Sequence, residues 1–198
     1  MTPLTSPSTD KPLKGETIAI LIASGFNEHD MTKAQRALID TGATVKMVAP
    51  DNGLVQGWHD NVWGHYFAAD AQISQVLAAD FSTLLIPGGQ RAMDKLKSNP
   101  HTARFLKGFL MYGKPVALFG DAVQLLAHVN LAEGKTVSGP EGMEQVMKAA
   151  GAVWSTEPVV VSENLLTGHN NNDEQISAMV AAMVELFKNI PEEYRMAA

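Results

Sequence analysis

The sequence predicts an α/β fold, a three-layer sandwich in which a mostly parallel central sheet lies between two layers of helices. Short apolar runs without polar alternation are typical of strands that are buried on both faces. Helical patterns separate these runs along the chain, as a parallel sheet requires. With 198 residues, of which 45% are hydrophobic and 18% charged, the chain is long and apolar enough for one domain with a full core.

The first half of the chain supplies the first parallel pair. The run TIAILIA at 17–23 predicts a strand, the loop SGFNEHD follows, and a helix is expected over 31–40, ending at Gly42. The run at 44–49 is the second strand, and a strand–helix–strand unit implies a right-handed crossover. Residues 57–67, GWHDNVWGHYF, combine turn residues with aromatics and predict a short hairpin or excursion.

The second half continues this alternation. Its predicted elements are a strand at 81–86, two helices between 91 and 112 separated at Pro100, a strand at 115–119, a helix at 122–129, a helix at 141–150, a strand pair at 158–161 and 164–167, and an amphipathic closing helix at 173–189.

The opening stretch MTPLTSPSTDKPLKG has no apolar segment of the kind that a secretory signal needs. We therefore expect a flexible tail over 1–14, a single domain over 15–198 and a cytoplasmic location. The net charge of −6 argues against nucleic acid or an anionic membrane surface as the main partner, and no apolar run is long enough to span a membrane. The absence of cysteine excludes disulfides, thiolate metal sites and a cysteine nucleophile.

The candidate site lies where three predicted strands end, because ligands of such sheets bind outside the carboxyl ends of the strands. The loops there are Gly25-Phe26-Asn27-Glu28-His29-Asp30, Pro87-Gly88-Gly89-Gln90 and Gly120-Asp121. The third loop joins a strand to a helix by a sharp turn, which is where a nucleophile often stands. That turn offers Phe119, Gly120 and Asp121, with no Ser, Cys or Thr.

These loops resemble the ThiJ/PfpI superfamily (also called DJ-one/PfpI), which shares the flavodoxin-like fold of class I glutamine amidotransferases. The resemblance covers nearly all of the chain after Gly15. It rests on IAILIASGF with an acid a few residues on, LLIPGG, VALFGDAVQLLAH and AGAVWSTEPVVVSENLLTG.

In active members of that superfamily a cysteine stands at the turn, an acid from the first loop hydrogen-bonds it, and backbone N–H groups of the Gly-Gly loop help to form an oxyanion site. Matched to this sequence, the cysteine position falls on Phe119 or Gly120, the acid on Asp30, and the donor loop on Gly88 and Gly89. The missing thiol argues against the cysteine-dependent activities of the family, namely peptidase, glyoxalase, deglycase and redox sensing.

The same turn resembles the C-terminal domains of large-subunit catalases, which lack the cysteine and often have Ala-Gly-Asp-Ala where this chain has Phe119-Gly120-Asp121-Ala122. The chain holds no haem-binding catalase domain. That resemblance therefore implies a stabilising or binding role rather than peroxide turnover.

Three carboxylates are candidate catalytic groups. Asp121 is either a replacement nucleophile or a cap of its own helix, and capping is the favoured interpretation. Asp30 and Glu28 are either a general-base pair, because neighbouring carboxylates raise one another's pKa, or ordinary first-turn acids of a helix. These two interpretations are evenly balanced.

Histidines and aromatics offer weaker signals. His29, His59, His65 and His169 lack the HExxH spacing, so we expect no metal; His169 is expected to border the cleft. No phosphate-binding glycine motif follows a strand, so we expect no cofactor. The dense aromatics Trp58, Trp63, Tyr66 and Phe67 are expected to pack beneath the excursion, with a pocket wall or a dimer surface as alternatives.

The sequence and the resemblance together predict a non-catalytic, homodimeric protein that acts as a binding, chaperone-like or stress-associated module, with Phe119 filling space that active members leave for substrate. A small molecule would bind in a cleft formed by Asp30, Gly88, Gly89, Phe119, Gly120, Asp121 and His169. The alternative is a glyoxalase-, deglycase- or amidase-like hydrolase or lyase that uses carboxylate or metal chemistry in the same cleft, with Asp30 or Glu28 as base and Asp121 as nucleophile or orienting group.

Overall fold

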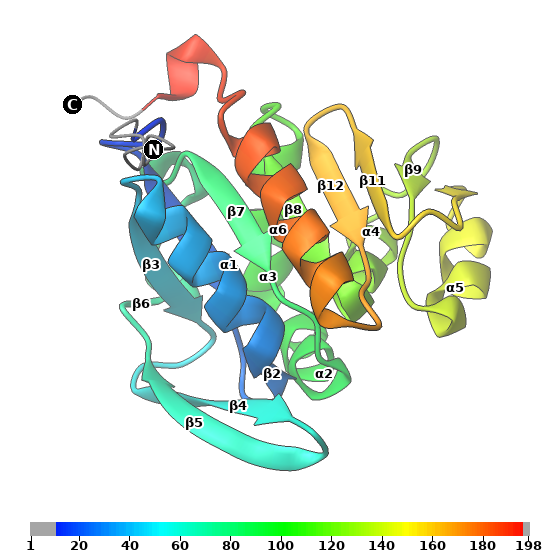
Figure 1. Ribbon diagram of the computed structural model, residues 1–198, viewed down its shortest axis with the longest axis horizontal. Helices are drawn as coiled ribbons and strands as arrows, with labels where there is room; N and C mark the ends of the chain where they lie inside the picture. The colour runs from blue at the N-terminus through cyan, green and yellow to red at the C-terminus, as the bar shows by residue number, and fades with distance from the viewer. Residues whose placement is uncertain (1–10, 196–198) are drawn as a thin grey trace, which may run out of the picture.

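The computed structural model describes residues 11–195, and it confirms the predicted sandwich (Figure 1). The central sheet consists of β1 (Thr17–Leu21), β3 (Thr44–Ala49), β6 (Ala71–Gln72), β7 (Thr83–Ile86), β8 (Val116–Phe119), β11 (Val159–Ser162) and β12 (Leu165–Gly168). Their order is β11-β12-β8-β7-β1-β3-β6, and every neighbouring pair is parallel except β11 with β12. The β7, β8 and β12 strands are buried along their whole length, as expected of strands in a parallel sheet that is covered on both faces.

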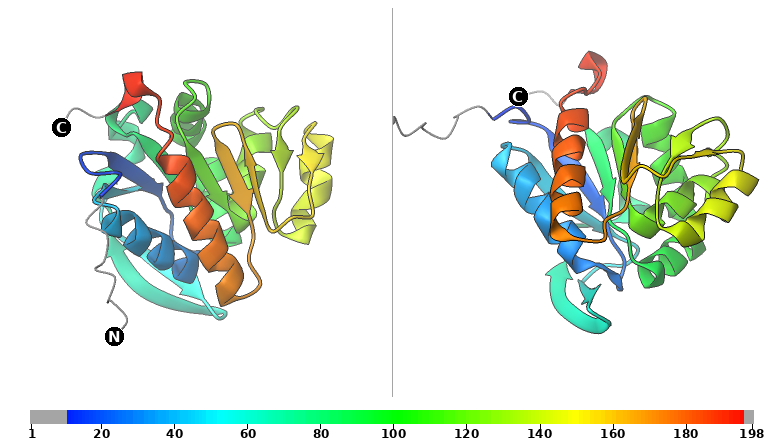
Figure 2. Two further views of the ribbon diagram at one scale, coloured as in Figure 1. Left: turned by 45° about the horizontal axis from the view of Figure 1, so that its top comes forward. Right: turned by 45° about the vertical axis from the view of Figure 1, so that its right-hand side comes forward.

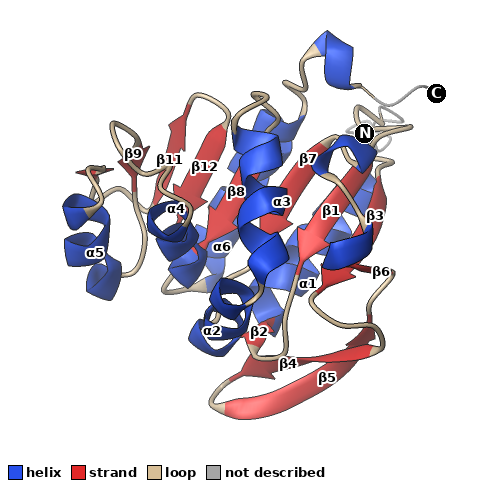
Figure 3. Cartoon of the chain, turned by 180° about the vertical axis from the view of Figure 1, so that it is seen from behind, coloured by secondary structure: helices blue, strands red, loops and turns tan. Residues whose placement is uncertain are grey.

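Helices cover both faces of the sheet. One layer holds α1 (Glu28–Asp40) and α6 (Asp173–Phe187), which lie side by side in Figure 1. The view from behind in Figure 3 shows the other layer, formed by α2 (Gln90–Ser98), α3 (Pro100–Leu110) and α4 (Gln124–His128). Beyond the β11 edge lie β9 (Thr136–Val137), α5 (Glu144–Ala149) and β10 (Val153–Trp154).

The predicted excursion is a long hairpin. Its strands β4 (Leu54–His59) and β5 (Val62–Ala68) pair antiparallel around a turn in which Asp60 and Asn61 have φ of 48° and 63°. A short strand, β2 (Phe26–Asn27), pairs with β4 and attaches the hairpin to the body of the protein. Figure 2 shows the hairpin (cyan) at the end of the molecule opposite the C-terminal turn (red).

Two of the element boundaries that differ from the predictions lie near the cleft. The α1 helix begins at Glu28 rather than at Met31, because the Asn27 side chain caps it by accepting the Asp30 N–H at 3.2 Å. The helix after β8 begins with a 3-10 turn over Gly120–Val123 before α4.

The start of the domain also differs. Of the predicted flexible tail, residues 1–10 lie outside the described part of the chain. Leu13 is fully buried, and its N–H donates to the Thr41 carbonyl oxygen at 3.1 Å. The packed domain therefore begins before the boundary expected at Gly15.

Candidate functional site

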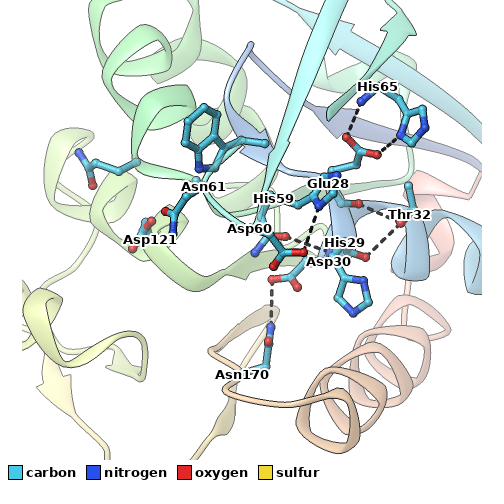
Figure 4. A pocket seen from close by; sticks show the side chains of 14 residues that line it. Glu28, His29, Asp30, Thr32, His59, Asp60, Asn61, His65, Asp121 and Asn170 are labelled. Carbon is cyan, nitrogen blue, oxygen red and sulfur yellow. Dashed lines mark hydrogen bonds and ion pairs between the residues drawn. The ribbon is translucent and has the colours of Figure 1, made fainter. Parts of the chain in front are cut away.

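A cleft of about 760 Å³ lies at the carboxyl ends of β1, β7 and β8 (Figure 4). One wall is the start of α1, and the opposite wall is the tip of the β4–β5 hairpin with Trp58, His59 and His65. Gly89, Gln90, Asp121 and Asn170 complete the lining from three other loops. The structure therefore brings together the three loops that the sequence placed at this edge of the sheet.

Not all predicted cleft residues line this space. Asp30, Gly89 and Asp121 do, as does the candidate acid Glu28, whereas Gly88, Phe119, Gly120 and His169 are not among its lining residues. His169 instead donates its backbone N–H to the Pro158 carbonyl oxygen at 3.0 Å, and its buried Nδ1 atom has no partner among the described residues.

Phe119 does not fill substrate space, contrary to the prediction. It is the last residue of β8, and its side chain is fully buried in the core. The sharp turn falls on Gly120, whose φ of +55° is the left-handed conformation that a nucleophile at such a turn adopts. A Cβ atom at Gly120 would meet only the Gly88 Cα, at 3.8 Å, so the backbone leaves room for a side chain. The position of the missing nucleophile is therefore Gly120.

The glycine loop after β7 packs against its neighbours backbone to backbone. The Gly88 carbonyl oxygen accepts the Asn27 N–H at 2.7 Å, and a Cβ atom at Gly88 would lie 2.9 Å from the Phe119 carbonyl oxygen. Gly89 has a φ of +117°, and a Cβ atom there would lie 2.4 Å from the Gly25 carbonyl oxygen. Only glycines permit this approach, which fixes the Gly89 N–H at the edge of the cleft.

The Asp121 carboxylate of the chain interacts with the Gly89 N–H group. Burial raises the pKa of Asp121 above its ordinary 3.8, and hydrogen bonds from the backbone N–H groups of Gly89 and Gln90 offset part of the rise. The carboxylate thus lies at the N-terminus of α2. Asp121 also lies in the first turn of its own 3-10 helix, as predicted, and its N–H partners belong to the neighbouring helix. One donor that the resemblance assigns to an oxyanion site is occupied by a carboxylate of the chain.

Asp30 is the most strongly perturbed acid of the cleft. Its side chain is 3% exposed, and burial raises its pKa from 3.8 to about 6. A hydrogen bond from the Asn170 Nδ2 atom at 3.0 Å and the charges of His29 and Lys33 oppose this rise, whereas the charge of Asp121 adds to it. Near neutral pH this carboxyl exchanges its proton readily, so it is suited to proton transfer.

Glu28 has a different task from Asp30. Its carboxylate accepts the backbone N–H of His65 at 2.8 Å and lies 2.5 Å from the His65 Nδ1 atom (Figure 4). Burial by itself raises the pKa of Glu28, but the hydrogen bonds and charge of His65, with the charge of His59, lower it overall. The carboxyl whose charge reaches Asp30 is Asp121 rather than Glu28. Asp30 and Glu28 therefore do not form the predicted pair of general bases, because the Glu28 carboxylate holds the hairpin through His65.

The aromatic side chains of the hairpin have two different roles. Trp58 lines the cleft and meets Trp63 edge to face, with ring centroids 5.1 Å apart. The Arg91 guanidinium lies 4.3 Å from the centroid of the Trp58 ring. Phe67 packs on Phe26 as expected, with centroids 5.4 Å apart. The cluster thus supplies both a cleft wall and the packing beneath the hairpin.

Two further histidines each pair with a carboxylate. His29 lies 2.9 Å from Asp173, and His59 lies 3.4 Å from Asp60. Within residues 11–195, no three His, Asp or Glu side chains are grouped as a metal ion would require. Nor does any helix of that range have the length and apolarity to cross a membrane.

Sequence reasoning missed Asn170 and the contact that holds the hairpin against α1. Asn170 follows the singled-out His169 directly, but its loop, GHNNND, is equally typical of an ordinary turn. His65 contacts Glu28 across 37 residues of sequence, a contact that no local pattern predicts.

Comparisons with known proteins agree with this geometry. The model of the DJ-1/PfpI family matches residues 16–185. The chain is 32% identical over 157 residues to YraA of Bacillus subtilis, covering 79% of this chain and 90% of that protein. It is 29% identical to General stress protein 18 of the same organism, covering 80% and 91%. The crystal structure of a ThiJ/PfpI domain protein from Brachyspira murdochii superposes with a TM-score of 0.78 at 21% identity, covering 90% of this chain and 99% of that one.

Proposed function

The chain belongs to the DJ-1/PfpI family, and we propose that within it this protein binds a small polar molecule in the cleft without forming a covalent bond to it. The chain contains no cysteine, and the position suited to a nucleophile is Gly120, which has no side chain. The name of its relative, General stress protein 18, supports a stress-associated role. A chaperone-like role and a link to catalase domains stay sequence-based predictions.

The position of Asp121 is the observation that carries this proposal. Covalent catalysis at a carbonyl needs free N–H donors for the oxygen on which charge develops. The N–H groups of Gly89 and Gln90 already face the Asp121 carboxylate, and their interaction with it lowers the pKa that burial raises. An incoming oxyanion would therefore compete with a carboxylate that the chain itself holds at these donors. This arrangement favours retention of a neutral polar ligand over acyl transfer.

A second candidate function is acid–base catalysis by Asp30, as in a lyase or hydrolase without a covalent intermediate. The pKa of about 6 favours it, because such a carboxyl both donates and accepts protons near neutral pH. In this scheme Asp30 protonates a carbonyl oxygen of the ligand or removes a proton beside it, and Asn170 orients the carboxyl.

The two functions are separated by measuring the consumption of small 2-oxoaldehydes. The wild-type chain, an Asp30→Asn, Asp121→Asn double variant and an Asp40→Asn control are compared; Asp40 is exposed at the far end of α1. Binding without turnover predicts rates equal to buffer for all three proteins. Turnover by the wild type and Asp40→Asn that disappears in the double variant would replace the proposal with the acid–base function.

A further inference from the structure

A second pocket lies at the amino ends of the central strands, on the side of the sheet opposite the cleft. It has a volume of about 610 Å³, within the usual range for small-molecule sites. Its walls are the 3-10 turn Ala78–Asp80 that precedes β7, the second half of α3, Lys114 just before β8, and the C-terminal turn around Tyr194. That last turn is the red one in Figure 1, far from the β4–β5 hairpin.

Lys114 is a buried cation at this pocket. Its side chain is 4% exposed, and Nζ donates to the carbonyl oxygens of Ala78 at 2.9 Å and Phe81 at 2.7 Å. An ammonium has three protons to donate, so one has no oxygen acceptor among the described residues. No carboxylate within residues 11–195 forms an ion pair with it. Burial lowers the pKa of Lys114, and the charge of Asp80 only partly opposes this effect.

The rest of the pocket is mostly apolar and aromatic. Tyr112 and Tyr194 meet edge to face with centroids 6.2 Å apart, and Lys114 Nζ lies 5.1 Å from the Tyr194 centroid. Leu77 adds an exposed apolar side chain at the rim. Arg104, whose guanidinium donates to two backbone carbonyls, and Arg195 add two positive charges, and Glu193 adds one negative charge. In a chain with a net charge of −6, this is a positively charged pocket with an apolar body.

We propose that this pocket binds a small amphipathic carboxylate, with its apolar body against Tyr112 and Tyr194 and its carboxylate toward Lys114. A desolvated ammonium that no carboxylate of the described residues contacts directly selects an anion, because a charge-assisted hydrogen bond is stronger there than in water. The aromatic walls select a flat or acyl body, since they gain by covering apolar surface. The carboxylate itself supplies the acceptor that the third Lys114 proton lacks.

The test uses two probes of the same shape, naphthalene-2-carboxylate and the neutral naphthalene-2-carboxamide, titrated into the full chain by calorimetry. The carboxylate is expected to bind about tenfold or more tightly than the amide, as one charge-assisted bond implies. Lys114→Met removes this preference and leaves the affinity for the amide unchanged.

Two further variants keep the test independent of the folding of Lys114→Met. Tyr194→Ala weakens both probes together, because it removes the apolar wall and leaves the ammonium in place. Met111→Ala is the matched control; Met111 is exposed beside Tyr112 and does not line the pocket. Equal binding of carboxylate and amide to the wild type would overturn the proposal. So would binding that appears only after residues 196–198 are removed, because the occupant would then be the chain itself.

Discussion

Asp30 and Asp121 are near each other at the cleft, yet their partners give them different chemistry. Asp30 receives one side-chain amide and keeps a pKa of about 6, whereas Asp121 receives two backbone N–H groups. The sequence placed both residues at the correct edge of the sheet. It could not assign their partners, because Asn170 and Gly89 lie in other loops that reach the cleft only in the folded chain.

Replacing Asp30 by Asn is expected to stabilise the protein above pH 6. Because burial raises the folded-state pKa, the unfolded chain ionises first as the pH rises from about 4 to 6, and the wild type loses stability over that window. The difference between about 6 and 3.8 corresponds to about 3 kcal/mol at most. Urea unfolding at pH 8 should give Asp30→Asn a free energy of unfolding that is higher than that of the wild type by up to this amount. Near pH 3.5 the two proteins should have equal free energies of unfolding. A constant difference across this range would contradict the assigned pKa.

Supplying a thiol at Gly120 tests the position of the missing nucleophile. Gly120→Cys should fold with a cost of about 1–2 kcal/mol, because any side chain at a φ of +55° is strained while the space above it is open. Its 2-oxoaldehyde consumption should stay low while Asp121 occupies the N–H donors. Adding Asp121→Ala frees these donors and should raise the rate about tenfold or more.

The control for this experiment is Gly142→Cys, which places a thiol in open space away from the cleft. Equal rates for the two single cysteine variants and the double variant would show that Gly120 is not a site of activation.

At the scale of elements, the sequence pattern was sufficient to predict the longer strands of the central sheet and most helices, but not two-residue strands such as β6 and β9. The β1, β7 and β8 strands, the break at Pro100 and the closing helix were all expected, because buried strands and amphipathic helices carry their own pattern. The hairpin was expected only as a short excursion. Its docking involves Glu28, whose side chain lies against Gly57 and Gly64 of the hairpin, far from it in sequence.

The docking of the hairpin is testable at Gly64. A Cβ atom there would lie 1.8 Å from Glu28 Oε2, so Gly64→Ala should lower the free energy of unfolding by about 1–3 kcal/mol. Gly142→Ala, in open space, should change it little. Combining Gly64→Ala with Glu28→Ala should cost less than the sum of the two single changes, since the clash needs both side chains. Strict additivity in urea unfolding would show that Glu28 does not hold the hairpin.

At the scale of the whole molecule, the two pockets lie at opposite edges of one sheet. The polar cleft collects acids and histidines from loops at the carboxyl ends, and the second pocket collects Lys114 and aromatics at the amino ends. The first was predictable, because parallel strands bring their ends together. The second was not, because Lys114, Tyr112 and Tyr194 belong to no motif. The homodimer and the cytoplasmic location stay predictions.

The central claim is that Asp121 occupies the backbone donors of Gly89 and Gln90. The most direct measurement follows the amide proton shifts of these two residues by NMR as the pH changes, in an Asp30→Asn background so that one carboxyl fewer titrates. Both protons should move together with a midpoint above 3.8, and the movement should vanish when Asp121→Asn is added. Movement that persists in the Asp121→Asn protein, or is absent before that change, would contradict the account.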